Sequence, residues 1–301
     1  MKTRSFLGAN DDHEFKVMSW NNNLEFTAEE AKVFVTAIKK YVYGFEPLSQ
    51  ARFRAMRKDI DSKWTNDQIL SSWRLLTTQH ALRCYKNANT VPEPVLKRIT
   101  YKNLLKFSKI YEVPPLALVS RALVAQEFSK TVTDKWIHQP NLITDADIHK
   151  LVITGWNHDS ENPTATKLIF QKSQEYERQV ERLLRSKGIA FKTQDQLVKE
   201  QTELYGRAII TPDFLLTEPI MVVVTHVDGT ITERIIHWID VKNYMFMGAG
   251  FITKGLLEQA AKYVKEFGEG AFMFHYGFVN SISISGTIML ASSETPVVQS
   301  T

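Results

Sequence analysis

Four short groups of polar residues between positions 175 and 259 have the side chains that a metal-dependent hydrolase needs. They are Glu177, Thr211-Pro212-Asp213, Asp240-Val241-Lys242 and Gln259. Two carboxylates that converge at strand ends can bind a divalent cation and activate a water molecule beside a phosphate. A lysine next to them can contact the negative charge of that phosphate. The order Glu…Pro-Asp…Asp-x-Lys…Gln therefore predicts a site for phosphodiester hydrolysis.

The same residues also have simpler interpretations. An aspartate that follows proline, as Asp213 does, is more often a turn or capping residue than a metal ligand. Asp240 and Lys242 could form an exposed ion pair, which contributes less than ~1 kcal/mol. Glu175 and Glu181 lie on the same predicted helix as Glu177, so either of them could be the functional glutamate instead. Order, spacing and element type together favour the catalytic interpretation.

Apolar spacing indicates which elements position these side chains. Residues 168–186 repeat apolar side chains at helical intervals, so Glu177 is expected on a helix. Residues 209–241 are rich in Ile and Val and contain the pair Asp228-Gly229, which is typical of a β-hairpin. The two carboxylate-bearing segments are therefore expected on neighbouring strands.

Asp240 and Lys242 are two residues apart on the second of these strands, so both side chains point to one face of the sheet. Gln259 lies in the amphipathic stretch 256–267, which predicts a helix, and residues 271–279 predict a central strand. The order helix, strand, strand, strand, helix, strand predicts an α/β fold with a mixed sheet flanked by helices.

Residues 27–143 predict an all-helical region. Segments 27–30 and 65–68 have the Thr-x-x-Glu/Gln spacing of helix capping boxes. Two further helices flank residues 112–115, Glu-Val-Pro-Pro, which is the outline of a helix-turn-helix. An ordinary helical bundle produces the same pattern, so both interpretations stay open.

Positive charge is concentrated in this region. Residues 50–110 hold thirteen Lys and Arg against four Asp and Glu, whereas the whole chain carries a net charge of only +4. Such an excess attracts a polyanion, most simply nucleic acid. A solvated helical surface is the alternative. Lys109 and Arg121, in the helix-turn-helix outline, are the first residues to test.

Composition is that of a soluble globular protein, with 44% hydrophobic and 23% charged residues. No stretch approaches the ~18 apolar residues that span a bilayer, so no membrane contact is expected. Cys84 is the single cysteine, which excludes an intramolecular disulfide and a cysteine zinc site. We therefore expect a reducing compartment, the nucleus and/or the cytoplasm.

Two sets of motifs resemble known families. Residues 176–191 resemble the first helix and strand of archaeal Holliday junction resolvases, which belong to the restriction-endonuclease-like PD-(D/E)xK superfamily. More narrowly, four segments resemble the eukaryotic codanin-interacting nuclease family, whose members carry a TPD domain behind an N-terminal region of helix-turn-helix character. These segments are Thr211-Pro-Asp-Phe214, Ile236-His-Trp-Ile-Asp-Val-Lys242, Gln259 and Phe274-His-Tyr-Gly-Phe278.

The resemblance implies a Mg²⁺-dependent endonuclease, with Mn²⁺ as a substitute, that acts on structured or branched DNA. By motif, Lys242 takes the basic catalytic position and Gln259 the auxiliary helix position. The implied metal ligands are Glu177, Asp213, Asp240 and the backbone carbonyl of Val241, and the three acidic side chains are also implied to be catalytic. One departure is Asp240, where many relatives have glutamate, and the shorter side chain could shift the metal or its preference for Mg²⁺.

The expected organisation is a flexible arm over 1–26, a helical, helix-turn-helix-like domain over 27–143, a PD-(D/E)xK nuclease domain over 144–291, and a tail over 292–301. The resemblance also implies a codanin-like protein partner, and a homodimer by analogy with the resolvases. A non-catalytic adaptor or nucleic-acid-binding scaffold with a nuclease-like fold is the alternative function. The choice between DNA and RNA stays open.

Overall fold

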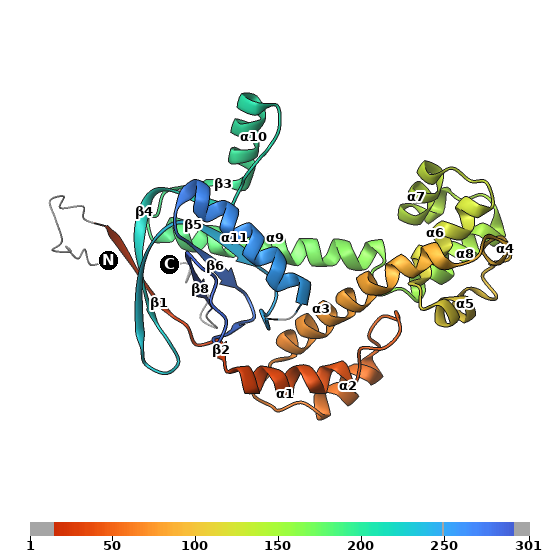
Figure 1. Ribbon diagram of the computed structural model, residues 1–301, viewed down its shortest axis with the longest axis horizontal. Coiled ribbons are helices and arrows are strands. Elements are labelled where there is room, and N and C mark those ends of the chain that lie inside the picture. The colour runs from red at the N-terminus through yellow and green to blue at the C-terminus, as the bar shows by residue number, and fades with distance from the viewer. Residues whose placement is uncertain (1–14, 249, 292–301) are drawn as a thin grey trace, which may run out of the picture. The chain divides into compact units, whose positions relative to one another are not determined.

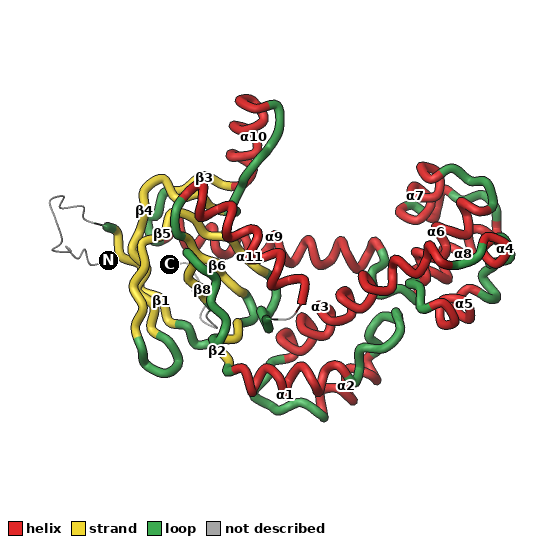
Figure 2. Tube along the Cα trace, viewed as in Figure 1, coloured by secondary structure: helices red, strands yellow, loops and turns green. Residues whose placement is uncertain are grey.

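The structure is a computed structural model that describes residues 15–248 and 250–291. The chain divides into two compact units, each of which folds around its own core. The sheet unit contains the chain up to Val33 and from Lys172 onwards, and the helical unit is Phe34–Gln171. Figures 1 and 2 show the strands gathered in the sheet unit. The helical unit is therefore inserted, along the sequence, between two parts of the sheet unit.

A six-stranded mixed sheet forms the centre of the sheet unit. Its order is β1-β4-β5-β6-β8, with β3 beside β4. Strand β4 is antiparallel to β3 and β5, and the other neighbours are parallel. The predicted α/β fold, with a mixed sheet flanked by helices, is confirmed. The strands are β1 (Lys16–Asn21), β3 (Phe191–Thr193), β4 (Phe214–Thr225), β5 (Ile231–Lys242), β6 (Gly270–Phe274) and β8 (Thr287–Leu290), beside a separate pair of β2 (Glu25–Phe26) and β7 (Phe278–Val279).

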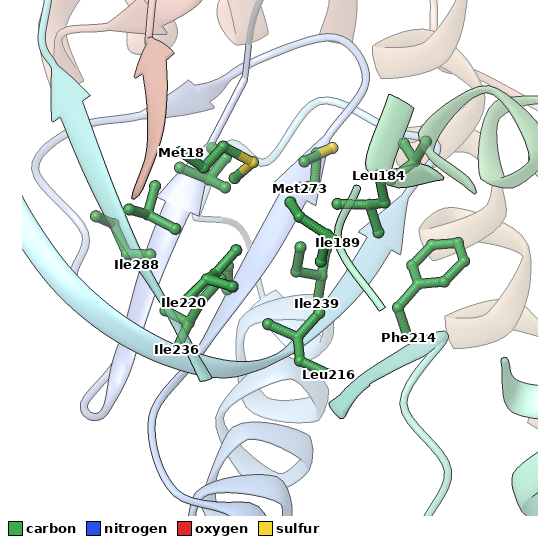
Figure 3. Close-up of a cluster of buried hydrophobic side chains, with 14 of the residues drawn as sticks. Met18, Leu184, Ile189, Phe214, Leu216, Ile220, Ile236, Ile239, Met273 and Ile288 are labelled. Atoms are coloured by element: carbon green, nitrogen blue, oxygen red, sulfur yellow. The ribbon is translucent and has the colours of Figure 1, made fainter. Parts of the chain in front are cut away.

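Two helices cover opposite faces of this sheet. Val180 of α9 packs in a buried cluster with Ile239 of β5, part of which Figure 3 shows. Ala260 of α11 packs in a second cluster with Trp238, whose side chain points to the other face because successive strand residues alternate. The helices of this unit are α9 (Pro163–Ser186), which begins in the helical unit, α10 (Gln194–Tyr205) and α11 (Gly250–Phe267).

The predicted hairpin is confirmed, and the central strand predicted over 271–279 is confirmed for its first part only, because β6 ends at Phe274 and Phe278–Val279 pair with β2. Strands β4 and β5 pair directly, and Gly229 in the turn between them has φ of 82°. Strand β6 lies between β5 and β8. Helix α10 was not predicted, although Thr193 and Gln196 form both hydrogen bonds of a capping box at its start. Leu197 is its one buried residue, so the helix lacks a periodic apolar face.

The expected flexible arm over 1–26 is wrong for the part that the structure describes. Residues 16–21 form β1, which runs parallel to β4 with Met18 opposite Val222. Met18 is the one fully buried residue of this short strand, so the sequence carried little apolar pattern. The expected boundary at 143/144 also differs, because the division falls at residues 171 and 172. A fragment that starts at residue 144 would lack an edge strand of the sheet.

A buried polar network fastens the segment after β1. The Asn22 amide donates to Glu25 Oε1 at 2.8 Å and to the Met289 carbonyl at 2.9 Å, and its oxygen accepts from the Ala291 N–H. His226, in the hairpin turn, donates from Nδ1 to Glu25 Oε1 at 2.6 Å. Three distant parts of the chain therefore meet around one buried carboxylate.

The helical unit is a bundle of short helices. The capping box predicted at Thr65 and Gln68 is present, as is the one at Thr27 and Glu30. Within the described residues, no helix of either unit is long and apolar enough to cross a membrane. The helices are α1 (Ala28–Lys39), which begins in the sheet unit, α2 (Gln50–Lys58), α3 (Asn66–Tyr85), α4 (Glu93–Leu96), α5 (Leu104–Tyr111), α6 (Pro115–Ala125), α7 (Lys130–His138) and α8 (Ala146–Asn157), with 3₁₀ turns over Lys86–Thr90 and Pro140–Leu142.

Helices α5 and α6 match the predicted helix pair, with a bend at Glu112, which has φ of 50°. Helix α6 is the centre of the bundle and packs against α4, α5, α7 and α8. Its residues 115–119 are all buried, and Arg121 is exposed. The start of a recognition helix must contact base edges in a DNA groove. Helix α6 cannot do so without uncovering the core of its own unit.

Gly270 at the start of β6 is required by the packing of Trp238. The Trp238 side chain is fully buried and donates from Nε1 to the Gly268 carbonyl at 2.9 Å. A Cβ at position 270 would lie 2.0 Å from Cε2 of that indole ring. The sequence analysis did not foresee that the absence of a side chain here makes room for the largest buried residue of the sheet unit.

Gly270→Ala should lower the free energy of unfolding by ~1–3 kcal/mol, because the added methyl overpacks the site. Gly255→Ala is the matched control, since Gly255 lies within α11 and no neighbouring atom lies within 4 Å of its Cβ position. This control should be stabilised by up to ~1 kcal/mol through helix propensity. Urea unfolding curves of both variants measure the difference. Equal stability of Gly270→Ala and the wild type would contradict this account of Gly270.

Candidate active site

The register of β4 with β5 places the two central carboxylates together. Phe214 pairs with Ile239 in the antiparallel ladder, so Asp213 and Asp240 are the next opposing residues. The backbone N–H of Val241 donates to Asp213 Oδ2 at 2.7 Å. Two aspartates that are distant in sequence therefore become neighbours where this pair of strands begins and ends.

Asp240 is buried, with 2% of its surface exposed, and polar side chains contact both of its oxygens. The Lys242 ammonium forms an ion pair with Oδ1, and the Gln259 amide donates to Oδ2 at 3.0 Å. Oδ1 accepts no hydrogen bond of ordinary geometry from the described part of the chain. The ion pair with Lys242 is therefore the main contact that compensates the negative charge at this oxygen.

Tyr263 extends this network and was missed by the sequence analysis. Its hydroxyl accepts from the Gln259 amide at 2.9 Å and donates to the Thr211 carbonyl at 3.1 Å. Burial, with the charge of Asp240, raises the pKa of Tyr263, so the phenol stays protonated. The sequence could have indicated Tyr263 through its position four residues after Gln259, because that spacing places both side chains on one face of α11.

Asp213 has a strongly perturbed acidity. Burial is the main cause, the charge of Asp240 adds to it, and together they raise the pKa of Asp213 to about 7. The hydrogen bond from Val241 and the charge of Lys242 oppose this shift. The two aspartates therefore compete for ionisation within one small, partly desolvated region.

Glu177 lies at the edge of this group. Burial raises its pKa, the negative charges of Asp195 and Glu181 add to the shift, and the charge of Asp240 contributes less. Glu177 and Asp195 both line a pocket of about 490 Å³ between α9 and the start of α10. The structure thus joins Asp240 to Lys242 and Gln259 through side-chain contacts and holds Asp213 to the same strand through the Val241 N–H, whereas the coupling of Glu177 to them is electrostatic.

A second set of contacts connects α9 to the end of β5. The His275 ring stacks on Tyr176 with centroids 3.9 Å apart. Its Nδ1 donates to the Asn243 amide oxygen at 2.7 Å, and the Asn243 amide donates to Ser173 Oγ at 3.4 Å. The His275 backbone N–H donates to the Lys242 carbonyl at 2.9 Å. The sequence analysis assigned no role to His275, which links α9, the helix of Glu177, to the strand that carries Lys242.

The donor set fits a hard divalent cation. Asp213 and Asp240 supply two neighbouring carboxylates, and Mg²⁺ is often bound through one or two carboxylates together with waters and substrate phosphates. Within the described ranges, no three Asp, Glu, His or Cys side chains are close enough to enclose a metal by themselves. Glu177 would therefore act through a bound water and not as a direct ligand in this conformation.

Asp213→Asn is expected to stabilise the metal-free protein, and more so at higher pH. The folded-state pKa of about 7 lies above the ordinary 3.8, so the folded protein binds more protons than the unfolded chain between these values. The stabilisation from the protonated carboxyl is complete below about pH 4 and is lost as the pH rises through 7. Thermal unfolding in EDTA should show a gain over wild type that is larger at pH 8 than at pH 5, by on the order of 2 kcal/mol.

Asp228→Asn is the control for this comparison. Hydrogen bonds from Thr230 lower the pKa of Asp228, so its ionised form is the stabilising one. That variant should gain no stability at pH 8. A gain for Asp213→Asn that is the same at both pH values would show that its carboxyl is not perturbed by burial.

Comparisons with known proteins show what part of the chain is similar to. Residues 144–293 match the family model described as "Protein of unknown function TPD sequence-motif". The chain is also similar to "Uncharacterized protein L539" of Acanthamoeba polyphaga mimivirus, at 26% identity over 288 residues, which covers 93% of this chain and 96% of the viral protein. No solved structure matches. The matched range, residues 144–293, includes all the candidate site residues.

Proposed function

We propose that this protein is a divalent-metal-dependent nuclease that hydrolyses phosphodiester bonds, with structured or branched DNA as its substrate. The observation that carries the proposal is the opposition of Asp213 and Asp240 across β4 and β5, with Lys242 in contact with Asp240. Two carboxylates and a lysine at one strand end are the groups that metal-assisted cleavage of a phosphodiester requires.

Asp213, Asp240 and the carbonyl of Val241 would hold the cation, with Glu177 contributing through a bound water. When bound, Mg²⁺, or Mn²⁺ in its place, supplies Lewis-acid polarisation of a phosphate oxygen and a water of lowered pKa. The hydrogen bond from the Val241 N–H to Asp213 keeps the two carboxylate-bearing segments together. The protein thus brings the proposed ligands together through its own backbone.

Lys242 has two tasks in this proposal. In the structure its ammonium compensates the charge of buried Asp240, a carboxylate that would otherwise be costly to desolvate. With a substrate present, the same ammonium can stabilise the negative charge that develops on the phosphate. Gln259 and Tyr263 fix the orientation of Asp240 from α11, so that the carboxylate does not rotate when the lysine moves.

The choice of DNA and the codanin-like partner both derive from the motif resemblance to codanin-interacting nucleases and to Holliday junction resolvases. A restriction-endonuclease-like grouping and a homodimer derive from the same source, whereas a location in the nucleus and/or the cytoplasm derives from the single cysteine. The mixed sheet flanked by helices, which the resemblance implies, supports this grouping. The excess of positive charge in the helical unit supports a polyanionic substrate.

Asp240→Asn and Lys242→Ala should each lower metal-dependent cleavage at least about 100-fold, the loss typical of removing one charge-stabilising group. The assay uses labelled four-way junctions, splayed arms, flaps, linear duplexes and single strands of DNA and RNA, with Mg²⁺ or Mn²⁺. Calorimetry should also show weaker Mg²⁺ binding by Asp240→Asn, because one ligand charge is lost.

Glu266→Gln and Lys262→Ala, two exposed positions on α11, are the controls because they make the same changes of charge away from the site. Both should cleave at the wild-type rate. Wild-type cleavage by Asp240→Asn and Lys242→Ala would remove the nuclease assignment from this site. A wild-type protein that folds and binds nucleic acid but cleaves no substrate in the panel would instead support the scaffold alternative.

A further inference from the structure

The basic residues of the helical unit differ in what they do. Arg52 donates to the Tyr41 carbonyl at 2.7 Å, and Arg57 donates to the Ile60 carbonyl at 3.1 Å. Lys97 is in an ion pair with Glu93 at 2.7 Å. These cations hold the unit's own loops and helices together. They are less available to an outside partner than a count from the sequence suggests.

Four other lysines lie exposed around α5, and we call them the lysine strip: Lys102, Lys106, Lys109 and Lys150. Lys106 and Lys109 are three residues apart on α5 and therefore share one face of that helix. Lys102 lies in the turn that leads into α5. Among the described residues, Asp147 is the one carboxylate in an ion pair with any of the four, an exposed contact to Lys150 at 3.7 Å.

Two lysines of the strip lie beside the same aromatic ring. The ammonium groups of Lys102 and Lys150 lie 5.7 Å and 5.2 Å from the centroid of Tyr101. The face of a tyrosine attracts a cation by about 0.5–1 kcal/mol at an exposed site, so Tyr101 holds both ammonium groups in one neighbourhood. A polyanion with regularly spaced charges can contact several of these exposed ammonium groups at once.

We propose that the lysine strip binds the sugar-phosphate backbone of nucleic acid, so that α5, and not the buried α6, is the helix that faces the substrate. The choice of nucleic acid over an acidic protein rests on the proposed nuclease function, whose substrate is a polyanion with regularly spaced charges. Lysines bind phosphates as point charges and read no base sequence. The strip therefore contributes affinity that is independent of sequence.

The test is a triple variant, Lys102→Gln, Lys106→Gln and Lys109→Gln, in the full-length chain. Binding to two fluorescent duplexes of unrelated sequence is measured by anisotropy in EDTA, so that no cleavage occurs, over a range of salt concentrations. The wild-type dependence of log K on log salt should flatten by up to about 2.7, since each lost contact contributes about 0.9. Affinity should fall by the same factor for both sequences.

The matched control is Arg54→Gln, Lys58→Gln and Lys135→Gln, which removes three exposed charges from α2 and α7 of the same unit. The salt slope of this control should differ from the wild-type slope by no more than the contribution of about one phosphate contact. A strip variant that binds like the wild type, or a control that loses as much as the strip variant, would overturn the proposal. Wild-type protein that shows no salt-dependent binding to either duplex would also overturn it and would point to a protein partner.

The outcome is separable from that of the proposed nuclease. The strip variant is judged by binding in EDTA and Asp240→Asn by metal-dependent cleavage, so each proposal has its own measurement. Loss of binding in the strip variant, together with unchanged cleavage by Asp240→Asn, would refute the nuclease site and keep the strip. Loss of cleavage in Asp240→Asn, together with normal binding by the strip variant, would support the nuclease site and refute the proposal for the strip.

Discussion

The pairing of β4 with β5 is the constraint on which the candidate site depends. A shift of one residue between these strands would turn Asp240 to the opposite face of the sheet and separate it from Gln259. The hairpin at Gly229 does not fix this register by itself. Between the hairpin and the site, Ile220 pairs with Ile236 and the next paired residues are Leu215 and Trp238. Over this stretch β4 therefore contains more residues than β5. The local irregularity in β4, more than the turn, brings Asp213 opposite Asp240.

Burial of Asp213 and Asp240 sets a second requirement. A buried carboxylate is tolerated only when donors and opposite charges compensate it, because its desolvation costs several kcal/mol. Here the compensation is supplied by the Val241 N–H, Lys242 and Gln259. The site is thus polar at the end of a sheet whose two faces are otherwise covered by apolar clusters.

The sequence predicted the parts of this arrangement that depend on local pattern. The helix of Glu177, the hairpin, the strand of Asp240 and the helix of Gln259 all follow from apolar period and turn residues. It did not predict β1, because one buried methionine in a short strand leaves no pattern, nor the stack of His275 on Tyr176, because such contacts are set by tertiary packing. The helix-turn-helix outline correctly gave two helices but not which of them is buried. Burial of α6 depends on how four other helices surround it.

The insertion of the helical unit has a consequence for how the chain acquires its fold during synthesis. Strand β1 is made before the helical unit, yet its hydrogen-bonding partner β4 follows roughly two hundred residues later, after the whole helical unit. At about 5–20 residues per second, β1 waits on the order of ten seconds or more on the ribosome before it can pair. The helical unit, whose contacts are mostly local, can be complete by then. The edge of the sheet is thus closed by a strand that is made before the helical unit, and residues 16–21 stay without their strand partner until β4 has been synthesised.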